Sequence, residues 1–156
     1  MKPLLKLVLV IAALASMAMA ADKPNFSGDW KMNAAKSNFG PLPAPATYTR
    51  KVTHAEPSIT IEDTQTGSVA GDQHDTRTYT TDGTEISYQA NGADVKAALT
   101  WDGDALQINA KASVQGMDIA IKDKITLRDG GKTMTDSLHI AAPQGEIDLT
   151  LVFDKQ

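Results

Sequence analysis

The sequence predicts an all-β protein, in which about ten antiparallel strands form an up-and-down meander that closes into one barrel. Two observations support this prediction. Apolar and polar residues alternate with a period of two through most of the chain after Thr47, and tight-turn dipeptides such as Asp-Gly and Asn-Gly separate the alternating segments. Closure is favoured because it removes exposed strand edges and hides the apolar face. A two-sheet β-sandwich is the alternative, since the same alternation occurs in both architectures.

A secretory signal peptide is expected at residues 1–20. Its lysines precede an apolar run at 7–15, and residues 18–20 have the small-x-small pattern of a cleavage site. The run is shorter than the roughly 20 residues that cross a bilayer. We therefore expect a single β-barrel domain at 21–156 that is periplasmic or secreted and is not stably inserted in a membrane.

The composition excludes several kinds of partner and site. The chain contains no cysteine, so it has neither disulfides nor thiolate metal ligands. Without the two lysines of the expected signal peptide, 13 basic residues stand against 19 acidic ones, a net charge near −6. Such a chain lacks the clustered Lys and Arg that bind nucleic acid. We expect a monomer with no nucleic-acid partner and no cofactor.

Each predicted strand is an alternating segment bounded by turn residues. The first contains the stretch "FSGDWKMN", with Phe26, Gly28, Trp30 and Met32 on one face. A segment with several prolines follows and has room for at most one turn of helix, near residues 34–37. The strands are expected at about residues 26–33, 47–54, 58–65, 73–80, 84–90, 93–101, 104–114, 118–128, 132–141 and 146–154.

Two-residue turn signals set the register between these strands. Asn, Asp and Gly tolerate the positive φ angles of type I′ turns, and such dipeptides occur at 82–83, 91–92, 102–103 and 130–131. Each turn brings apolar residues to one face, which a wrong register would not do. The expected pairs are Tyr79 with Ile86 and Arg77 with Tyr88 at the first turn, Tyr88 with Val95 and Ile86 with Ala97 at the second, and Leu99 with Leu106 and Ala97 with Ile108 at the third.

The stretch around Gly28 and Trp30 resembles the G-x-W opening strand of the lipocalin and fatty-acid-binding-protein (calycin) superfamily. The resemblance implies that Trp30 closes one barrel end and that Gly28 lets backbone approach it. The chain after residue 20, through "TDGT", "WDGDAL" and "DGGKTMT", is also similar to small exported bacterial proteins of unknown function. The helical pair of fatty-acid-binding proteins and the terminal helix of lipocalins have no counterpart. Lipocalins also place an Arg over the Trp, and Arg128 is the only late Arg.

Polar residues that share the parity of the apolar face are candidates for a binding site. A buried charge costs several kcal/mol unless it finds a partner, water or a ligand. The polar residues with this parity are Arg50, His54, Asp63, Arg77, Asp123 and Asp136.

Arg77 with Tyr79 and Tyr88 predicts a guanidinium flanked by phenols, which suits a carboxylate or another anionic head group. This set resembles the lumenal Arg and Tyr of fatty-acid-binding proteins, which implies an amphipathic or lipid-like ligand. The alternative is that Arg77 pairs with an internal acid such as Asp63 and is structural. Arg50 is a further candidate, although it can instead lie near the barrel rim and reach solvent.

Asp123 and Asp136 are expected to be diagonal neighbours across the hairpin at Gly130-Gly131. Two close carboxylates shift each other's pKa values, and such a pair can act as general acid and base or hold a cation. The alternative is that either group turns to solvent. No recognisable catalytic motif accompanies the pair, and the three His residues lack metal-ligand spacing, so we expect neither an enzyme nor a metal site.

Three functions are compatible with these features. The leading one is a binding barrel with no chemistry of its own. The second is a structural or interaction barrel whose core is filled by its own side chains, and the third is a hydrolase that uses Asp123 and Asp136. In the leading interpretation the ligand's apolar tail lies against Ile108, Ile121, Leu138 and Leu149, and its polar end lies near Arg77, Tyr79 and Tyr88.

Overall fold

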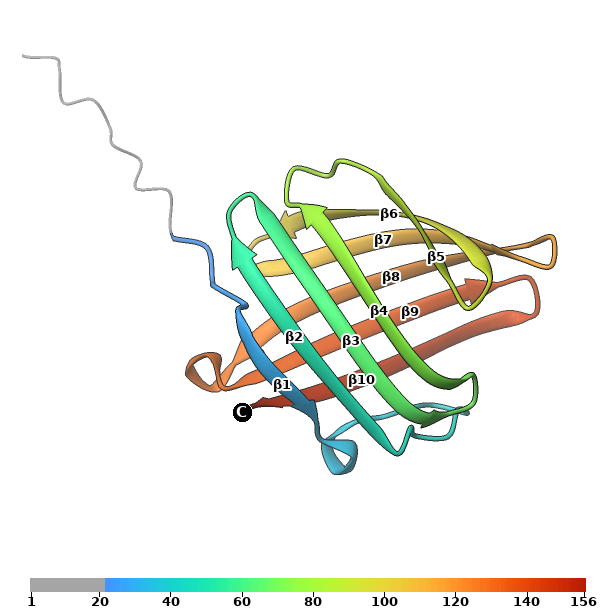
Figure 1. Ribbon diagram of the computed structural model, residues 1–156, viewed down its shortest axis with the longest axis horizontal. Coiled ribbons are helices and arrows are strands. Elements are labelled where there is room, and N and C mark those ends of the chain that lie inside the picture. Colours follow the sequence, from blue (N-terminus) through green and yellow to red (C-terminus); the bar gives the residue numbers. More distant parts are fainter. Residues whose placement is uncertain (1–21) are drawn as a thin grey trace, which may run out of the picture.

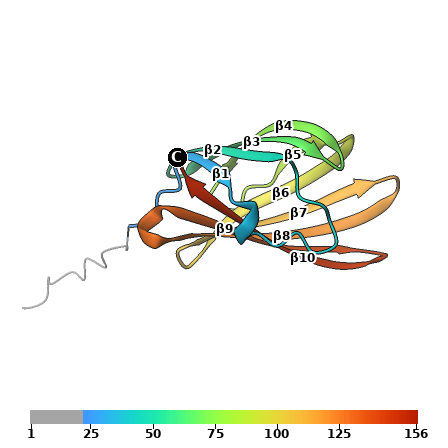
Figure 2. The same cartoon turned by 90° about the horizontal axis from the view of Figure 1, so that it is seen from below.

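The computed structural model describes residues 22–156, so the expected signal peptide at 1–20 lies outside the described residues. Ten antiparallel strands form one continuous sheet in the order β4-β3-β2-β1-β10-β9-β8-β7-β6-β5 (Figure 1). Figure 2 shows that this sheet curls into a flattened barrel, with β2, β3 and β4 facing β6 to β10. The predicted up-and-down barrel is confirmed, and the continuous ladder through β1 and β10 excludes two separate sheets. The strands are β1 (Gly28–Met32), β2 (Thr47–Ala55), β3 (Ser58–Ser68), β4 (Gly71–Thr80), β5 (Ile86–Ala90), β6 (Ala93–Asp102), β7 (Ala105–Val114), β8 (Met117–Arg128), β9 (Thr133–Ala142) and β10 (Gly145–Lys155).

The alternation in the sequence becomes an alternation of burial. On β2, for example, every second residue from Tyr48 to His54 is buried and the residues between them are exposed. The inward side chains meet in one apolar core, whose largest fully buried members are Trp30, Tyr79, Phe26, Phe153, Ile59, Leu99, Leu106, Ile125 and Met134. In the part of the chain that the structure describes, no helix has the length and hydrophobicity needed to cross a bilayer.

Trp30 on β1 is almost fully buried within this core. Its indole Nε1 donates a hydrogen bond of 3.2 Å to the carbonyl oxygen of Phe26. Gly28 has a φ of +149°, and a Cβ there would lie 2.6 Å from Cε of Lys155. The ammonium group of Lys155 lies 5.3 Å from the centre of the Trp30 ring, within the range of a cation–π contact. Lys155 therefore provides the cation over this Trp, and Gly28 leaves room for its stem.

The barrel is open between β4 and β5. Within residues 22–156 these strands share no hydrogen-bonded ladder, so the expected pairs Tyr79 with Ile86 and Arg77 with Tyr88 are wrong. The Asp-Gly turn does not form a hairpin because the Asp82 carboxylate accepts hydrogen bonds from the Thr80 hydroxyl and from the backbone and hydroxyl of Thr84. Asp82 then bridges to Thr100 on β6, and the connection passes the end of that strand.

The register between β6 and β7 differs from the expected one by two residues. Leu99 lies opposite Ile108, and Ala97 lies opposite Ala110. The two loop residues are Gly103 and Asp104, with a φ of +62° at Gly103, so Gly takes the first loop position as in a type II′ turn. A shift of two residues preserves parity, and the same side chains therefore still point inward.

Other predicted hairpins have the expected geometry. Asn91 and Gly92 both have positive φ, as a type I′ turn requires. The pairs Tyr88 with Val95 and Ile86 with Ala97 are confirmed. Between β8 and β9 the turn is a short 3-10 segment, η2 (Asp129–Gly131). Asp123 lies opposite Leu138 and Asp136 lies opposite Ile125, so the two acids are diagonal neighbours as expected.

The proline-containing segment after β1 covers the part of β10 that β1 does not reach. It begins with the single turn η1 (Ala34–Lys36), as the sequence predicts. The backbone N–H of Asn33 donates to Val152 over 2.7 Å, and Asn38 forms a bridge with Thr150. Beyond this contact the segment passes over one mouth of the barrel, to which it contributes Phe39 and Leu42.

Candidate ligand-binding site

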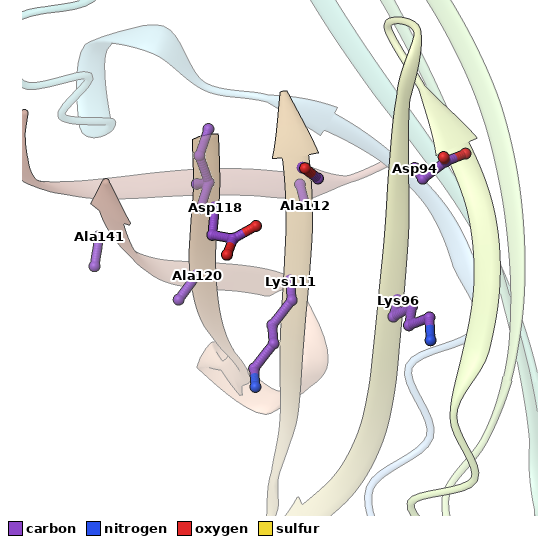
Figure 3. Close-up of a pocket in the computed structure, with 9 residues that line it drawn as sticks. Asp94, Lys96, Lys111, Ala112, Asp118, Ala120 and Ala141 are labelled. Carbon is purple, nitrogen blue, oxygen red and sulfur yellow. The ribbon is translucent and has the colours of Figure 1, made fainter. Parts of the chain in front are cut away.

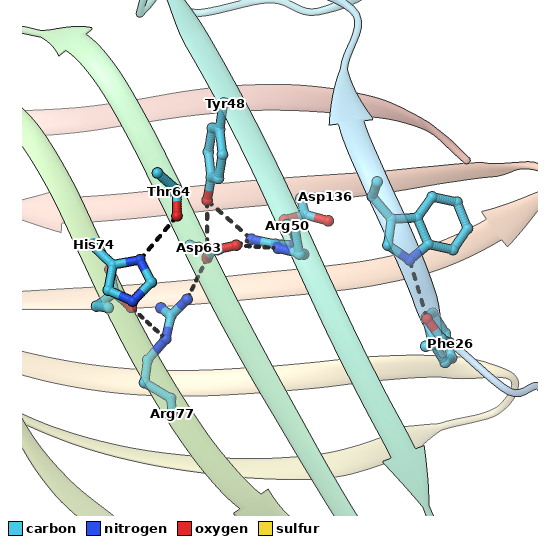
Figure 4. Close-up of polar contacts among 10 residues, drawn as sticks. Phe26, Tyr48, Arg50, Asp63, Thr64, His74, Arg77 and Asp136 are labelled. Atoms are coloured by element: carbon cyan, nitrogen blue, oxygen red, sulfur yellow. Dashed lines mark hydrogen bonds and ion pairs between the residues drawn. The ribbon is translucent and has the colours of Figure 1, made fainter. Parts of the chain in front are cut away.

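Arg50 is the centre of a buried charged cluster inside the barrel. It lies on β2 directly opposite Asp63 on β3, and its guanidinium contacts that carboxylate through Nε at 2.6 Å and Nη2 at 3.0 Å. Its third nitrogen, Nη1, donates to Asp136 on β9 over 2.6 Å. Figure 4 shows this contact reaching from β2 to the opposite layer of the barrel. Arg50 is only 5% exposed, so the alternative of a rim position is wrong.

Arg77 on β4 completes the cluster on the other side of Asp63. Its Nη2 donates to the same carboxylate, and its Nε lies 2.9 Å from Oδ1 of Asp75. The side chain is 19% exposed, and its guanidinium carbon lies 5.9 Å from the centre of the Tyr88 ring. The structural pairing with Asp63 that the sequence offered as an alternative is thus present, and Tyr88 lies beside Arg77 as expected. Strands β4 and β5 share no hydrogen-bonded ladder, so only the side chains bring Arg77 and Tyr88 together.

The Asp63 carboxylate is held in its charged form by both arginines. Burial alone would raise its pKa, but the charges and hydrogen bonds of Arg50 and the charge of Arg77 outweigh burial and keep the pKa below its usual value. The Tyr48 hydroxyl donates to Oδ2 of Asp63 over 3.1 Å and accepts a hydrogen bond from Arg50. Asp63 therefore accepts hydrogen bonds from three side chains that belong to β2 and β4.

Asp123 and Asp136 differ from Asp63 in their protonation. Burial raises the pKa of Asp136, and Arg50 offsets part of this effect. Burial also raises the pKa of Asp123 well above its usual value, and the neighbouring Asp136 raises it further. The Oδ1 atom of Asp123 is buried and has no hydrogen-bond partner in the described chain. Asp123 therefore keeps its proton to a higher pH than an ordinary aspartate does.

The mouth that Phe39 and Leu42 cover contains a pocket of about 270 Å³. Its wall includes inward side chains of β9 and β10, among them Leu138 and Leu149, and the ring of Tyr48. Leu138 is the cross-strand neighbour of Asp123, and Tyr48 donates to Asp63, so the pocket borders the charged cluster.

Two larger hollows lie on the outer face of β6 to β9. Their volumes are about 430 and 550 Å³, and both are open to solvent. Figure 3 shows the first of them, in which Lys111 on β7 lies between Ala120 on β8 and Lys96 on β6. Most of the residues that line these hollows have side chains on the outer face of the barrel, so the hollows are separate from the lumen.

The remaining predicted polar residue, His54, lies at the closed end of the barrel. Its Nδ1 accepts a hydrogen bond of 3.2 Å from the backbone of Phe26, and its Nε2 lies 2.8 Å from Glu56. His54 is therefore structural and far from the mouth pocket. Among residues 22–156 no group of three or more His, Asp or Glu side chains is arranged to hold a metal ion.

Sequence reasoning missed two members of the cluster. Asp75 was not considered, although it lies directly opposite Asp63, where two acids would repel without Arg77 between them. The expected polar set also lacked Tyr48, an inward residue on β2. An inward Tyr within two residues of an inward Arg is the signal that could have identified it.

The sequence has no match among protein-family models or curated proteins. Solved structures do match. Zebrafish ileal bile acid-binding protein complexed with cholic acid has a TM-score of 0.60 at 13% identity, over 84% of this chain and 98% of that one. A secretory abundant heat soluble protein from Ramazzottius varieornatus has a TM-score of 0.61 at 12% identity, over 83% of this chain and 94% of that one. A Schistosoma mansoni fatty acid binding protein in complex with arachidonic acid has a TM-score of 0.51 at 13% identity, over 84% of this chain and 96% of that one. This chain therefore has the fold of the fatty-acid-binding-protein-like barrels of the calycin group.

Proposed function

We propose that this protein is an exported binding barrel that takes one amphipathic or lipid-like molecule into its lumen and performs no chemistry on it. The observation that carries the proposal is the mouth pocket, which has an apolar wall of Leu138, Leu149 and Leu151 and borders the charged cluster. Apolar walls with a few convergent polar groups are typical of small-molecule sites. Its volume of about 270 Å³ is close to the lower end for such sites, roughly 300 Å³.

The structural neighbours support this proposal. Two of them were solved with an amphipathic acid, cholic acid in one and arachidonic acid in the other. They share the barrel fold with this chain at low sequence identity. They therefore support the general kind of ligand and leave its identity open. Their character as binding proteins is also consistent with the absence of catalysis.

For the polar end of the ligand, the sequence favours an anionic head group at Arg77. Binding of that kind requires Arg77 to exchange Asp63 or Asp75 for the ligand, because both acids already contact its guanidinium. If Arg77 binds the head group, Arg77→Ala weakens the binding of a fatty acid and leaves the fold intact. If Arg77 is structural, the same change lowers the stability of the barrel instead.

Export belongs to the proposal through the expected signal peptide at residues 1–20. Such a signal peptide would direct the protein to the periplasm or to the exterior of the cell. Cleavage after residue 20 can be checked by mass spectrometry of the protein recovered from its own host.

The pocket itself is tested by filling it. Leu149→Trp places a large ring at the mouth, and it should reduce binding of a fluorescent fatty-acid analogue at least ten-fold because the bound chain and the ring cannot share the space. Ala120→Trp adds the same ring in the outer hollows and should leave binding unchanged. Equal binding by both variants and the unmodified protein, or binding lost only in Ala120→Trp, would contradict a lumenal site.

A further inference from the structure

One carboxyl oxygen of Asp123, inside the barrel, has no hydrogen-bond partner in the described chain. Asp123 lies on the inner face of β8, is 9% exposed, and is opposite Leu138, which lines the mouth pocket. Its Oδ1 is closed off from solvent and accepts no hydrogen bond from the described chain. Buried polar groups in native proteins are almost always hydrogen-bonded, so an unpartnered carboxyl group beside a pocket calls for a ligand group that supplies the donor.

Two further oxygen atoms in the same cluster are also unpartnered. They are Oδ1 of Asp136, on the neighbouring strand β9, and the hydroxyl of Tyr79 on β4. Burial raises the pKa of Tyr79, the charge of Arg77 opposes this effect, and the neighbouring Tyr88 and Asp123 raise the pKa further. Together the three residues present three oxygen acceptors, and a protonated primary amine carries three N–H donors.

The charges around Asp123 also favour a cation. The groups that face it are Arg50, Asp63, Arg77 and Tyr79 from β2 to β4, and Asp136 from β9. Arg50 already contacts Asp63 and Asp136, and Arg77 already contacts Asp63 and Asp75. Asp123 is therefore the surplus acid. A ligand carboxylate would add another negative charge to this buried cluster, whereas a ligand ammonium would neutralise the acid that has no counter-ion.

We infer that Asp123 is the counter-ion for a protonated amine, so that the ligand is an amphipathic amine whose chain lies in the mouth pocket and whose nitrogen is held by Asp123, Asp136 and Tyr79. The inference rests on the proposed function, and it gives the head group the charge opposite to the one that Arg77 favours. An ammonium group beside Asp123 lowers the pKa of this carboxyl group, so binding releases any proton that Asp123 holds.

Four probes with the same alkyl chain separate charge from hydrogen bonding. Dodecylamine, dodecyltrimethylammonium, dodecanol and dodecanoate are titrated into the purified protein at pH 7 by calorimetry. Dodecylamine should bind about 10- to 100-fold more tightly than dodecanoate, the effect of one or two charge-assisted hydrogen bonds. Dodecyltrimethylammonium, a cation without N–H donors, should lie between them. Titrations in buffers of different ionisation enthalpy should show the release of up to one proton with dodecylamine.

The matched variants are Asp123→Asn and Asp118→Asn, which remove an inward and an outward carboxylate from the same strand. Asp123→Asn should abolish both the preference for dodecylamine and the proton release, and Asp118→Asn should keep both. Tighter binding of dodecanoate, or an unchanged amine preference in Asp123→Asn, overturns the inference and leaves the binding barrel standing. If none of the four probes binds, the proposed function itself fails.

Discussion

At the scale of single residues, Arg50 joins the two layers of the barrel. Its guanidinium is hydrogen-bonded to Asp63 on β3 and to Asp136 on β9, and all three side chains are buried. It also lies 4.8 Å from the centre of the Phe153 ring on β10. A buried ion pair costs desolvation that its attraction only partly repays, so the cluster specifies how the layers meet more than it adds stability.

Removing Arg50 should nevertheless lower stability, because buried acids would be left without their cation. We expect Arg50→Met to lower the free energy of unfolding by about 3–5 kcal/mol, because Asp136 loses the one cation that it contacts within residues 22–156 and Asp63 loses one of two. Urea unfolding at pH 7 measures this loss. Lys51→Met, on the outer face of the same strand, should change stability by less than about 0.5 kcal/mol. A loss below about 1 kcal/mol in Arg50→Met would contradict the central role.

Asp123 should make stability depend on pH in the opposite sense to a salt-bridged acid. Its pKa is raised in the folded protein, so the folded state binds more protons than the unfolded state above about pH 3.9, and stability falls as pH rises from there towards the raised pKa. Asp123→Asn should flatten this decline and gain about 1 kcal/mol at pH 7. Urea unfolding from pH 4 to pH 8 checks both effects, and a variant that is less stable at pH 7 would disprove them.

Some of the residue contacts could be predicted from the sequence and others could not. Parity identified Arg50, Asp63, Arg77, Asp123 and Asp136 as inward, because strand periodicity is a local property. The contact between Arg50 and Asp136 joins residues 86 positions apart, and it follows only from the way the barrel closes. No local pattern contains that information, so the depth of Arg50 could not be inferred.

At the scale of elements, β1 depends on a conformation that only Gly adopts easily. Gly28 has a φ of +149°, and its missing side chain leaves room for the Lys155 stem next to Trp30. Local turn chemistry was less predictive. The Asp-Gly pair at 82–83 has the composition of a hairpin turn, but hydrogen bonds from Thr80 and Thr84 to Asp82 direct the chain to β6. The side chains around a turn decide its course as much as the dipeptide does.

We expect Gly28→Ala to destabilise the barrel by about 1–3 kcal/mol, since it places a Cβ in strained backbone and pushes Lys155 away from Trp30. Chemical unfolding followed by Trp fluorescence reports both the stability and the environment of the ring. Lys31→Ala, an exposed position on the same strand, is the control and should have little effect. A variant Gly28→Ala as stable as the control would show that this conformation is not required.

At the scale of the whole molecule, the opening between β4 and β5 leaves the strands unequally protected from hydrogen exchange. In the described part of the chain, strand β5 is hydrogen-bonded only to β6, whereas β8 lies between β7 and β9. In hydrogen–deuterium exchange we expect the amides of β5 to exchange at least ten-fold faster than those of β8, because fewer neighbours must open. Equal protection of the two strands would mean that the opening is closed in solution.

The pairing of β1 with β10 has a consequence for the order of events during folding. Arg50 and Asp136 lie 86 residues apart in the chain, so the final neutralising contact of the cluster has to wait until β9 has joined the sheet. Until then the hairpin of β2 and β3 carries a guanidinium with only one of its acids. Joining the first strand to the last is consequently the late and slow step of assembly, since it closes the longest loop in the molecule.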